Sequence, residues 1–545
     1  MESTRPTKLE DLSKQDLIAR IYALEAQLPP NSHRKRPQTY QTESFPFHLH
    51  PTRKVAFKFS YAGWAYNGLA AQSQPTPLPT VEQVLFDAFV ATRLVDPVGG
   101  MDGCGWSRCG RTDRGVSAAG QVVSLRVRSV LGERKPIGQE PENSISETEL
   151  AEEDVPVDDD MGLPLGLASP SSSRPPTPPP STSPKRELAY IHMLNRILPP
   201  TIRILAWSPV SDTFDARFSC QFRHYKYFFP LGGRTGDKLD ITAMRDAARR
   251  LVGEHDFRNF CKLDPSKQIE NFRRRVMGAW IERVDLDSAI EPPTQDSSLE
   301  TNSDAEEMYV FNLKGTAFLW HQVRCIMAVL FLVGSKLEQP SIIDYLLHTS
   351  QDSSKSSSLP DSTPPVESKP NYTMADALPL VLWDCGYRSE DISWQTDAEF
   401  ETRDGIITDR ERTHNLWFQL YSIWTHDRVQ TTMQEYFLRA AEVFYPRPGP
   451  GLTDPNPEPA DSHQAPDDIP HPELDSNSRI DGPVKLTMGG GAFRHMTKYM
   501  PVLELDRGEC AEVANARWRE GAAGKRRIAK RDAKRGQLVE GDHEE

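Results

Sequence analysis

The stretch CGRTDRGVSA, residues 109–118, places one acidic residue, Asp113, between Arg111 and Arg114 in a glycine-rich loop. The alternating stretch QVVSLRV, residues 121–127, follows within a few residues and predicts a β-strand. The flanking glycines allow the backbone to approach a bulky ligand, and the strand gives the loop a rigid support. The pattern therefore predicts a loop that presents a carboxylate beside a sheet.

Two interpretations of Asp113 follow from these neighbours. A carboxylate held ionised by a nearby arginine can act as a nucleophile or general base, and it is a poor general acid. The alternative is an aspartate that only caps its own turn. The two arginines, the glycines and the adjoining strand favour the chemical role.

The sequence predicts no metal site and no cofactor. Cys104 and Cys109 are separated by four residues, and no second cysteine pair follows at a spacing typical of zinc ligands. The chain has neither the phosphate-loop motif nor the dinucleotide-binding glycine motif, so we expect no nucleotide cofactor.

Working outward, strands and helices recur in a similar order in two segments. This order predicts an α+β fold with two similar lobes, each a mixed or antiparallel sheet with helices on one face, and with long disordered insertions. The first lobe has expected strands at residues 55–61, 121–127 and 202–208, and helices after the Thr80 capping box and at 190–198. The second has expected strands at 224–230, 272–285, 308–315 and 379–387, and helices at 241–252 and 320–336.

Composition divides the chain further. We expect an N-terminal helix and basic linker at residues 1–50, a first catalytic lobe at 51–209, a second at 210–445, a disordered linker at 446–483, and a C-terminal segment with a basic tail at 484–545. Within the lobes, acidic or Ser/Pro-rich composition predicts a disordered insertion at 131–187 and disordered loops at 285–307 and 349–370.

The net charge of −13 conceals a basic body. Four acidic segments, at residues 139–160, 285–307, 349–370 and 446–483, together carry −25, so the remainder carries +12. A basic body suits a polyanionic partner, and the alternative is a cationic solvated surface. The chain has no run of eighteen apolar residues, so we expect no membrane-spanning helix, and no signal segment is apparent. The scattered cysteines suggest reduced thiols of an intracellular protein.

Two further stretches carry candidate binding residues. In RHYKYF, residues 223–228, Tyr225 and Tyr227 lie on one side of an expected strand, a pattern that suits base stacking or a core-facing pair. In FLWHQVR, residues 318–324, Arg324 lies at the start of an apolar helix and needs an anionic partner, either Asp113 or a phosphate. The histidine of this stretch reads as a packed side chain without a role.

These stretches together resemble the TruA family of tRNA pseudouridine synthases. GRTDRGVSAAGQVVSL is similar to the family's catalytic loop, FDARFSC with RHYKYFF to its second motif, GTAFLWHQVRCIMAVLFLVG to its third, and ADALPLVLWD to its last. The similarity covers residues 54–384 without the insertions. Two departures are Ser117, where bacterial members have histidine, and Pro379, which replaces an aromatic residue. The stretches look most like the eukaryotic branch that acts on tRNA positions 38 and 39; a branch acting on other positions is the alternative.

The resemblance implies a role for each site residue. Asp113 would be the nucleophile, attacking the uridine at the ribose C1′ or at the pyrimidine C6. Tyr225 would stack on the flipped base and take part in proton transfer, and Leu378 would lie near that base. Arg324 would pair with Asp113, and Arg111 would support the loop or fill the gap that the base leaves.

The same resemblance implies an isomerase, an intramolecular transferase, that needs no cofactor. It implies the tRNA anticodon arm as partner and a homodimer. The basic tail is typical of nucleic-acid binding or of a nuclear address, with a solvated tail as the alternative, and we expect a protein of the nucleus and cytoplasm. Two hypotheses from other classes compete with it. One is a tRNA-binding factor without chemistry, and the other is a hydrolase with two carboxylates, which the lack of a second acid in the CGRTDRGVSA loop disfavours.

Overall fold

A computed structural model describes the chain in five parts. These are residues 45–131, 187–284, 307–397, 416–445 and 481–529, apart from residues 73, 233–237, 351–358, 361, 443, 523 and 528. The expected N-terminal helix and most of the insertions and linker predicted at 131–187, 285–307 and 446–483 lie outside the described residues. Residues 50–545 form one unit by their contacts.

The first lobe is built around β1 (Thr52–Tyr61). This strand pairs antiparallel with β3 (Ser117–Arg128) on one side and with β4 (Ile202–Pro209) on the other. Its alternating sequence turns Phe57 toward the helices, where its ring meets Phe89 of α2 at 5.0 Å and Tyr190 of α4 at 5.7 Å. The remaining elements are α2 (Val81–Ala91), α3 (Gly100–Gly103), β2 (Ser107–Arg108) and α4 (Tyr190–Asn195). The aromatic contacts place α2 and α4 on the same face of the sheet.

The second lobe is centred on β5 (Phe222–Pro230), which pairs antiparallel with β8 (Met308–Gly315) and β9 (Leu380–Gly386). The most apolar helix, α6 (Gln322–Gly334), is buried along nearly its whole length. Its Phe331 ring contacts Tyr227 and Phe229 of β5, so α6 covers one face of this half of the sheet. The other elements are α5 (Ile241–Arg249), β6 (Gly253–Asp256), β7 (Arg273–Arg283) and α7 (Ile342–Leu347).

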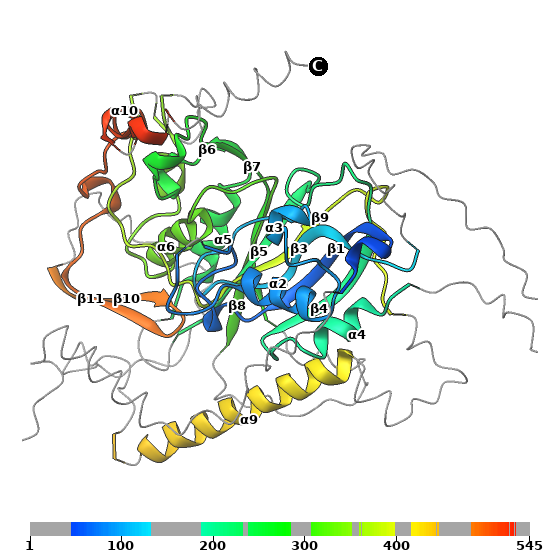
Figure 1. Cartoon of the computed structure of the whole chain (residues 1–545). Coiled ribbons are helices and arrows are strands. Elements are labelled where there is room, and N and C mark those ends of the chain that lie inside the picture. The colour runs from blue at the N-terminus through cyan, green and yellow to red at the C-terminus, as the bar shows by residue number, and fades with distance from the viewer. Residues whose placement is uncertain are drawn as a thin grey trace, which may run out of the picture. The chain divides into compact units, whose positions relative to one another are not determined.

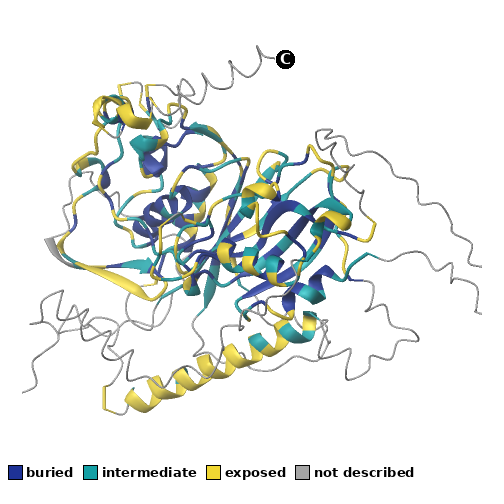
Figure 2. Cartoon of the chain, viewed as in Figure 1, coloured by how far each residue is buried: buried dark blue, intermediate teal, exposed yellow. Residues whose placement is uncertain are grey.

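The two lobes share one sheet of nine strands (Figure 1). Strands β3 and β9 run parallel and pair Ser117 with Val381 and Ala118 with Leu382, giving the order β4-β1-β3-β9-β5-β8-β7-β6, with β2 also on β3. The expected α+β class is confirmed, and Figure 2 shows the buried residues concentrated along the strands and α6. Because β3, β9 and β5 are neighbours, the segments that precede Ser117 and Val381 meet beside the middle of the sheet.

Several elements differ from the sequence prediction. The C-terminal region forms a hairpin, β10 (Asp481–Gly489) with β11 (Ala492–Lys498), and ends in α10 (Ala511–Glu520). The 27-residue helix α9 (Leu416–Glu442) was also not predicted. Within the loop predicted at 349–370, Val366 is buried, and its carbonyl accepts from the side-chain amide of Asn259. None of the helices in the described parts is long and apolar enough to cross a bilayer.

Candidate active site

The loop that carries Asp113 is tied to the sheet on both sides. Thr112 Oγ1 shares a 2.7 Å hydrogen bond with the Tyr61 hydroxyl at the end of β1, and its carbonyl accepts from the Leu69 amide at 3.3 Å. At the loop's start, Gln121 of β3 donates from Nε2 to the Gly110 carbonyl at 3.0 Å. Each bond fixes backbone next to the acid, so the carboxylate is presented from a rigid base.

Gly115 and Ser117 show why this loop needs its small residues. Gly115 has φ +85°, and a Cβ there would lie 3.3 Å from Cβ of Ala377, which precedes β9. Ser117 is buried, and its Oγ accepts from the Gly63 amide at 2.9 Å. A Cβ on Gly63 would overlap the Val116 carbonyl. The serine that departs from the bacterial pattern therefore closes the loop against the short 3-10 turn Gly63–Ala65 that follows β1.

The Asp113 carboxylate lies against two consecutive aromatic residues at the start of α6. Trp320 donates from Nε1 to Oδ1 at 3.2 Å, and His321 Nε2 lies 3.4 Å from Oδ2. Asp113 remains 31% exposed, so a ligand can reach it. His321 has φ +62°, a left-handed conformation that is uncommon outside glycine and is found often at functional sites. The sequence analysis missed both residues, although their motif precedes an apolar helix.

The expected partners of Asp113 are elsewhere. Arg111 and Arg114 are exposed, and neither makes an ion pair within the described chain. No ion pair joins Arg324 to Asp113 among the described residues, and Arg324 Nε instead donates to the Ala375 carbonyl at 2.8 Å. The Ala375 amide in turn donates to the Arg324 carbonyl at 3.2 Å. Arg324 therefore holds the segment before β9 onto α6, and its terminal nitrogens have no protein partner among the described residues.

His321 is neutral near pH 7 in this environment. Burial lowers its pKa below the ordinary value, the Asp113 carboxylate opposes that shift, and the Arg324 and Lys262 cations add to it. Its Nδ1 is buried without a hydrogen-bond partner. A neutral imidazole leaves the negative charge on Asp113 unneutralised, which keeps the carboxylate nucleophilic.

Tyr225 and Tyr227 lie on the same face of β5, as predicted, with different surroundings. Tyr225 is buried with its ring edge-on to Phe318 at 5.1 Å, and its hydroxyl makes no hydrogen bond to any described residue. Burial raises the pKa of Tyr225, so the phenol stays protonated. The Tyr227 hydroxyl donates to the Asp376 carbonyl at 3.0 Å. Tyr227 is thus held by a hydrogen bond within the protein, while the Tyr225 hydroxyl has no hydrogen-bond partner among the described residues.

Leu378 lies near the Asp113 loop, because the residue before it contacts that loop. Its side chain is 44% exposed, its amide donates to Asp376 Oδ1 at 2.8 Å, and the preceding Ala377 is the residue that Gly115 approaches. The structure therefore brings Asp113, the start of α6 and the segment before β9 together. Arg111 projects from the same loop as an exposed cation without a partner in the described chain.

Arg223 on β5 supports the site, and the sequence analysis gave it no role. It donates from Nη2 to the Cys109 carbonyl at 2.8 Å and from Nη1 to the Thr316 carbonyl at 2.8 Å. One guanidinium thus links the start of the Asp113 loop to the chain that leads into Trp320. Arg223 lies two residues before Tyr225 in the sequence, and this position could have indicated a role near the site.

Comparison with known proteins identifies the family of this chain. The family model for tRNA pseudouridine synthase matches residues 247–388, which include the start of α6 and Leu378. The chain is 39% identical over 402 residues to a tRNA pseudouridine(38/39) synthase of Saccharomyces cerevisiae, covering 70% of this chain and 72% of that protein. It is 27% identical over 352 residues to tRNA pseudouridine synthase A of Methanothrix thermoacetophila, covering 64% of this chain and 88% of that one.

The chain therefore belongs to the tRNA pseudouridine synthase family, which confirms the resemblance seen in its motifs. Within the family it is also 37% identical over 390 residues to the tRNA pseudouridine(38/39) synthase of Bos taurus. That match covers 72% of this chain and 64% of the cattle protein, so the chain spans slightly less than two thirds of that relative's length.

Proposed function

We propose that this protein isomerises uridine to pseudouridine at positions 38 and 39 of the tRNA anticodon arm, with Asp113 as the nucleophile. The observation that carries the proposal is the partly exposed Asp113 carboxylate on a tied loop, facing Trp320 and a neutral His321. The choice of positions is supported by the names of the eukaryotic relatives at 36–39% identity.

The proposed reaction rearranges one nucleotide. The Asp113 carboxylate attacks at the ribose C1′ or at C6 of the base, the bond between N1 and C1′ breaks, and the uracil turns. A new bond joins C5 to C1′, and the bond to Asp113 breaks, which restores the carboxylate. C5 then releases its proton and N1 takes one up. Atoms and electrons balance within the substrate, so the residues need no cofactor.

The target base has to leave its stack to reach Asp113, at a cost of a few kcal/mol. Tyr225 supplies a ring face and a protonated hydroxyl, and Leu378 supplies an exposed apolar edge beside the loop. Arg111 is suited to fill the space that the base leaves or to hold a phosphate, because it is exposed and unpaired within the described chain. The terminal nitrogens of Arg324, which do not pair with Asp113, can donate hydrogen bonds to a second phosphate.

The partners and location belong to the same proposal. A homodimer that shares one tRNA is proposed from the family resemblance, and a nuclear and cytoplasmic protein from the basic residues that follow Trp518. Size-exclusion chromatography with light scattering, and imaging of the tagged full chain with and without residues 517–535, test these two points separately.

The reaction is tested with the purified full chain and an unmodified tRNA transcript bearing uridine at positions 38 and 39. Carbodiimide labelling and primer extension read the product. We expect pseudouridine at both positions, no product from Asp113→Asn, and tRNA affinity within a few fold of wild type for that variant, because its size is unchanged. Asp102→Asn, on exposed α3, is the matched control and should keep full turnover.

Each other outcome assigns a different function. Product at other tRNA positions keeps Asp113 as nucleophile and overturns the choice of positions. A protein that binds tRNA and forms no product at any position is the binding factor without chemistry. Loss of tRNA affinity together with turnover in Asp113→Asn makes Asp113 a structural residue.

A further inference from the structure

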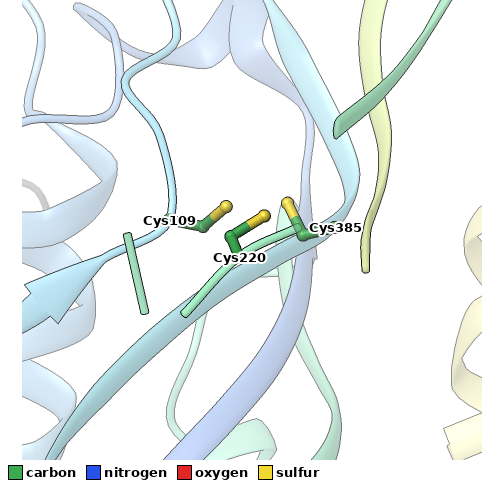
Figure 3. A group of neighbouring side chains, drawn as sticks. All are labelled: Cys109, Cys220 and Cys385. Atoms are coloured by element: carbon green, nitrogen blue, oxygen red, sulfur yellow. The ribbon is translucent and has the colours of Figure 1, made fainter. Parts of the chain in front are cut away.

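Three cysteines that lie far apart in the sequence meet beneath the Asp113 loop (Figure 3). Cys109 begins that loop, Cys220 precedes β5, and Cys385 lies in β9. Their Sγ atoms all lie within 4.8 Å of one another, and Figure 3 shows the three sulfur ends next to each other. Cys109 and Cys385 are buried, and Cys220 is partly exposed.

The backbone around the cluster is fixed by hydrogen bonds that do not involve the sulfurs. The Cys109 amide donates to the Val122 carbonyl at 2.8 Å, and Cys385 pairs with Arg223 across the β5–β9 ladder. Next to Cys220, the Gln221 amide donates to the Gly386 carbonyl at 2.8 Å. The three side chains are therefore held in place by the sheet itself.

The separation of the sulfurs matches a metal site. A bond of about 2.3 Å from each sulfur to a shared ion puts the sulfurs about 4 Å apart, within the observed limit of 4.8 Å. A disulfide uses two sulfurs and leaves the third unexplained. Buried cysteines also serve as ordinary apolar side chains, but such a role does not require three thiols to converge.

We propose that Cys109, Cys220 and Cys385 bind one thiophilic metal ion, Zn²⁺ or Cu⁺, through their three sulfurs. Thiolate ligands select these ions over harder ones. Three thiolates around Zn²⁺ carry one net negative charge, and the Arg223 guanidinium, which donates to the Cys109 carbonyl, offsets it. Each ligand still protonated releases its proton on binding, and the partly exposed side at Cys220 leaves room for a water on zinc.

The site lies outside the substrate-contacting residues. Cys109 is four residues before Asp113, so a bound ion fixes the start of the loop and joins it to β5 and β9. The inference goes beyond the proposed reaction and does not depend on it, because metal binding is measured directly.

The test uses the reduced, metal-free full chain titrated with Co²⁺, Zn²⁺ or Cu⁺, each alone. We expect one ion per chain, sulfur-to-cobalt charge-transfer absorption with Co²⁺, and displacement of the cobalt by Zn²⁺. Cys220→Ser should weaken binding on the order of a hundredfold. Cys104→Ser is the matched control, because Cys104 is a buried cysteine outside the cluster whose Sγ donates to the Met101 carbonyl.

A second measurement needs no variant. Iodoacetamide labelling of the wild-type chain, followed by peptide mapping, should show Cys220 protected by one equivalent of metal, with Cys510 unaffected. Tight binding of Cu⁺ with weak binding of Zn²⁺ assigns the site to copper, and the reverse assigns it to zinc. The proposal is overturned if the wild type binds neither ion through sulfur, or if the Cys220→Ser/Cys385→Ser double variant binds as tightly as wild type.

Discussion

The imidazole Nε2 of His321 lies 3.4 Å from Asp113 Oδ2, and the left-handed backbone of His321 holds it there. Burial is the main reason that the pKa of His321 is lowered in the fold. The unfolded chain therefore takes up a proton at this histidine at a higher pH than the folded chain does. The contribution of neutral His321 to the free energy of unfolding is fully present above the ordinary histidine pKa near 6.5. It is lost as pH falls through the lower pKa of the folded state.

This gives a prediction for His321→Gln, which cannot titrate. Between about pH 7.5 and about pH 5.5, on either side of the ordinary histidine pKa, the free energy of unfolding of the wild type should fall more steeply than that of the variant. Urea denaturation at both pH values measures the difference. His495→Gln, on exposed β11, should keep the wild-type slope. Equal slopes for wild type and His321→Gln would mean that His321 does not titrate differently in the fold.

We expect substitutions at the two tyrosines of β5 to have different effects, one on turnover and the other on stability. Tyr225→Phe removes a hydroxyl with no hydrogen bond to the described protein, so unfolding free energy should change by less than about 0.5 kcal/mol while turnover falls by about 100-fold. Tyr227→Phe removes the bond to the Asp376 carbonyl and should cost about 1 kcal/mol without lowering turnover of the folded fraction. Denaturation curves and single-turnover assays of both variants decide the matter. The reverse pattern would exchange the two roles.

Gly115→Ala tests the close approach between the loop and the segment before β9. Alanine at φ +85° costs about 1–2 kcal/mol, and its Cβ pushes on Ala377 at 3.3 Å, so turnover should fall by about tenfold. Gly100→Ala has the same kind of backbone strain, at φ +58°, and no atom within 4 Å. It should lose similar stability and keep turnover. If both variants lose activity alike, the contact with Ala377 does not position the site.

Arg111→Ala tests the proposed phosphate contact. Removing one cation from the tRNA interface should lower the slope of log affinity against log salt by about 0.7–0.9. Filter binding at several salt concentrations measures it. Arg196→Ala, an exposed arginine at the end of α4, should leave the slope unchanged. An unchanged slope for Arg111→Ala would place Arg111 away from the phosphates.

Much of the fold was predictable because its strands are short runs rich in apolar and β-branched residues. The pattern of β8 matched its observed bounds, and the Thr80 cap starts α2 as expected, accepting from the Gln83 amide. The β10–β11 hairpin was missed because its turn holds three consecutive glycines, which read as linker.

A residue of the site could be predicted only where the residues next to it in the sequence form a recognisable motif. Asp113 stood out by its own loop. His321 had no local signal, since its contact with Asp113 joins two segments that are far apart in the sequence. The cysteine cluster likewise depends on strand pairing over more than a hundred residues. The sequence did not indicate that Arg324 Nε donates to the Ala375 carbonyl, and a phosphate partner for Arg324 stays a prediction.

The C-terminal hairpin affects how the protein is made. The Asp376 amide donates to the Met488 carbonyl at 2.7 Å, and Gly489 lies so close to the Tyr227 hydroxyl that no other residue fits there. The segment before β9, which carries Leu378, is thus held in part by residues translated more than a hundred codons later. A ribosome has to pass codon 489 before these contacts can form, so a nonsense or frameshift mutation between β9 and β10 leaves every motif residue translated and Asp376 without its bond to the hairpin.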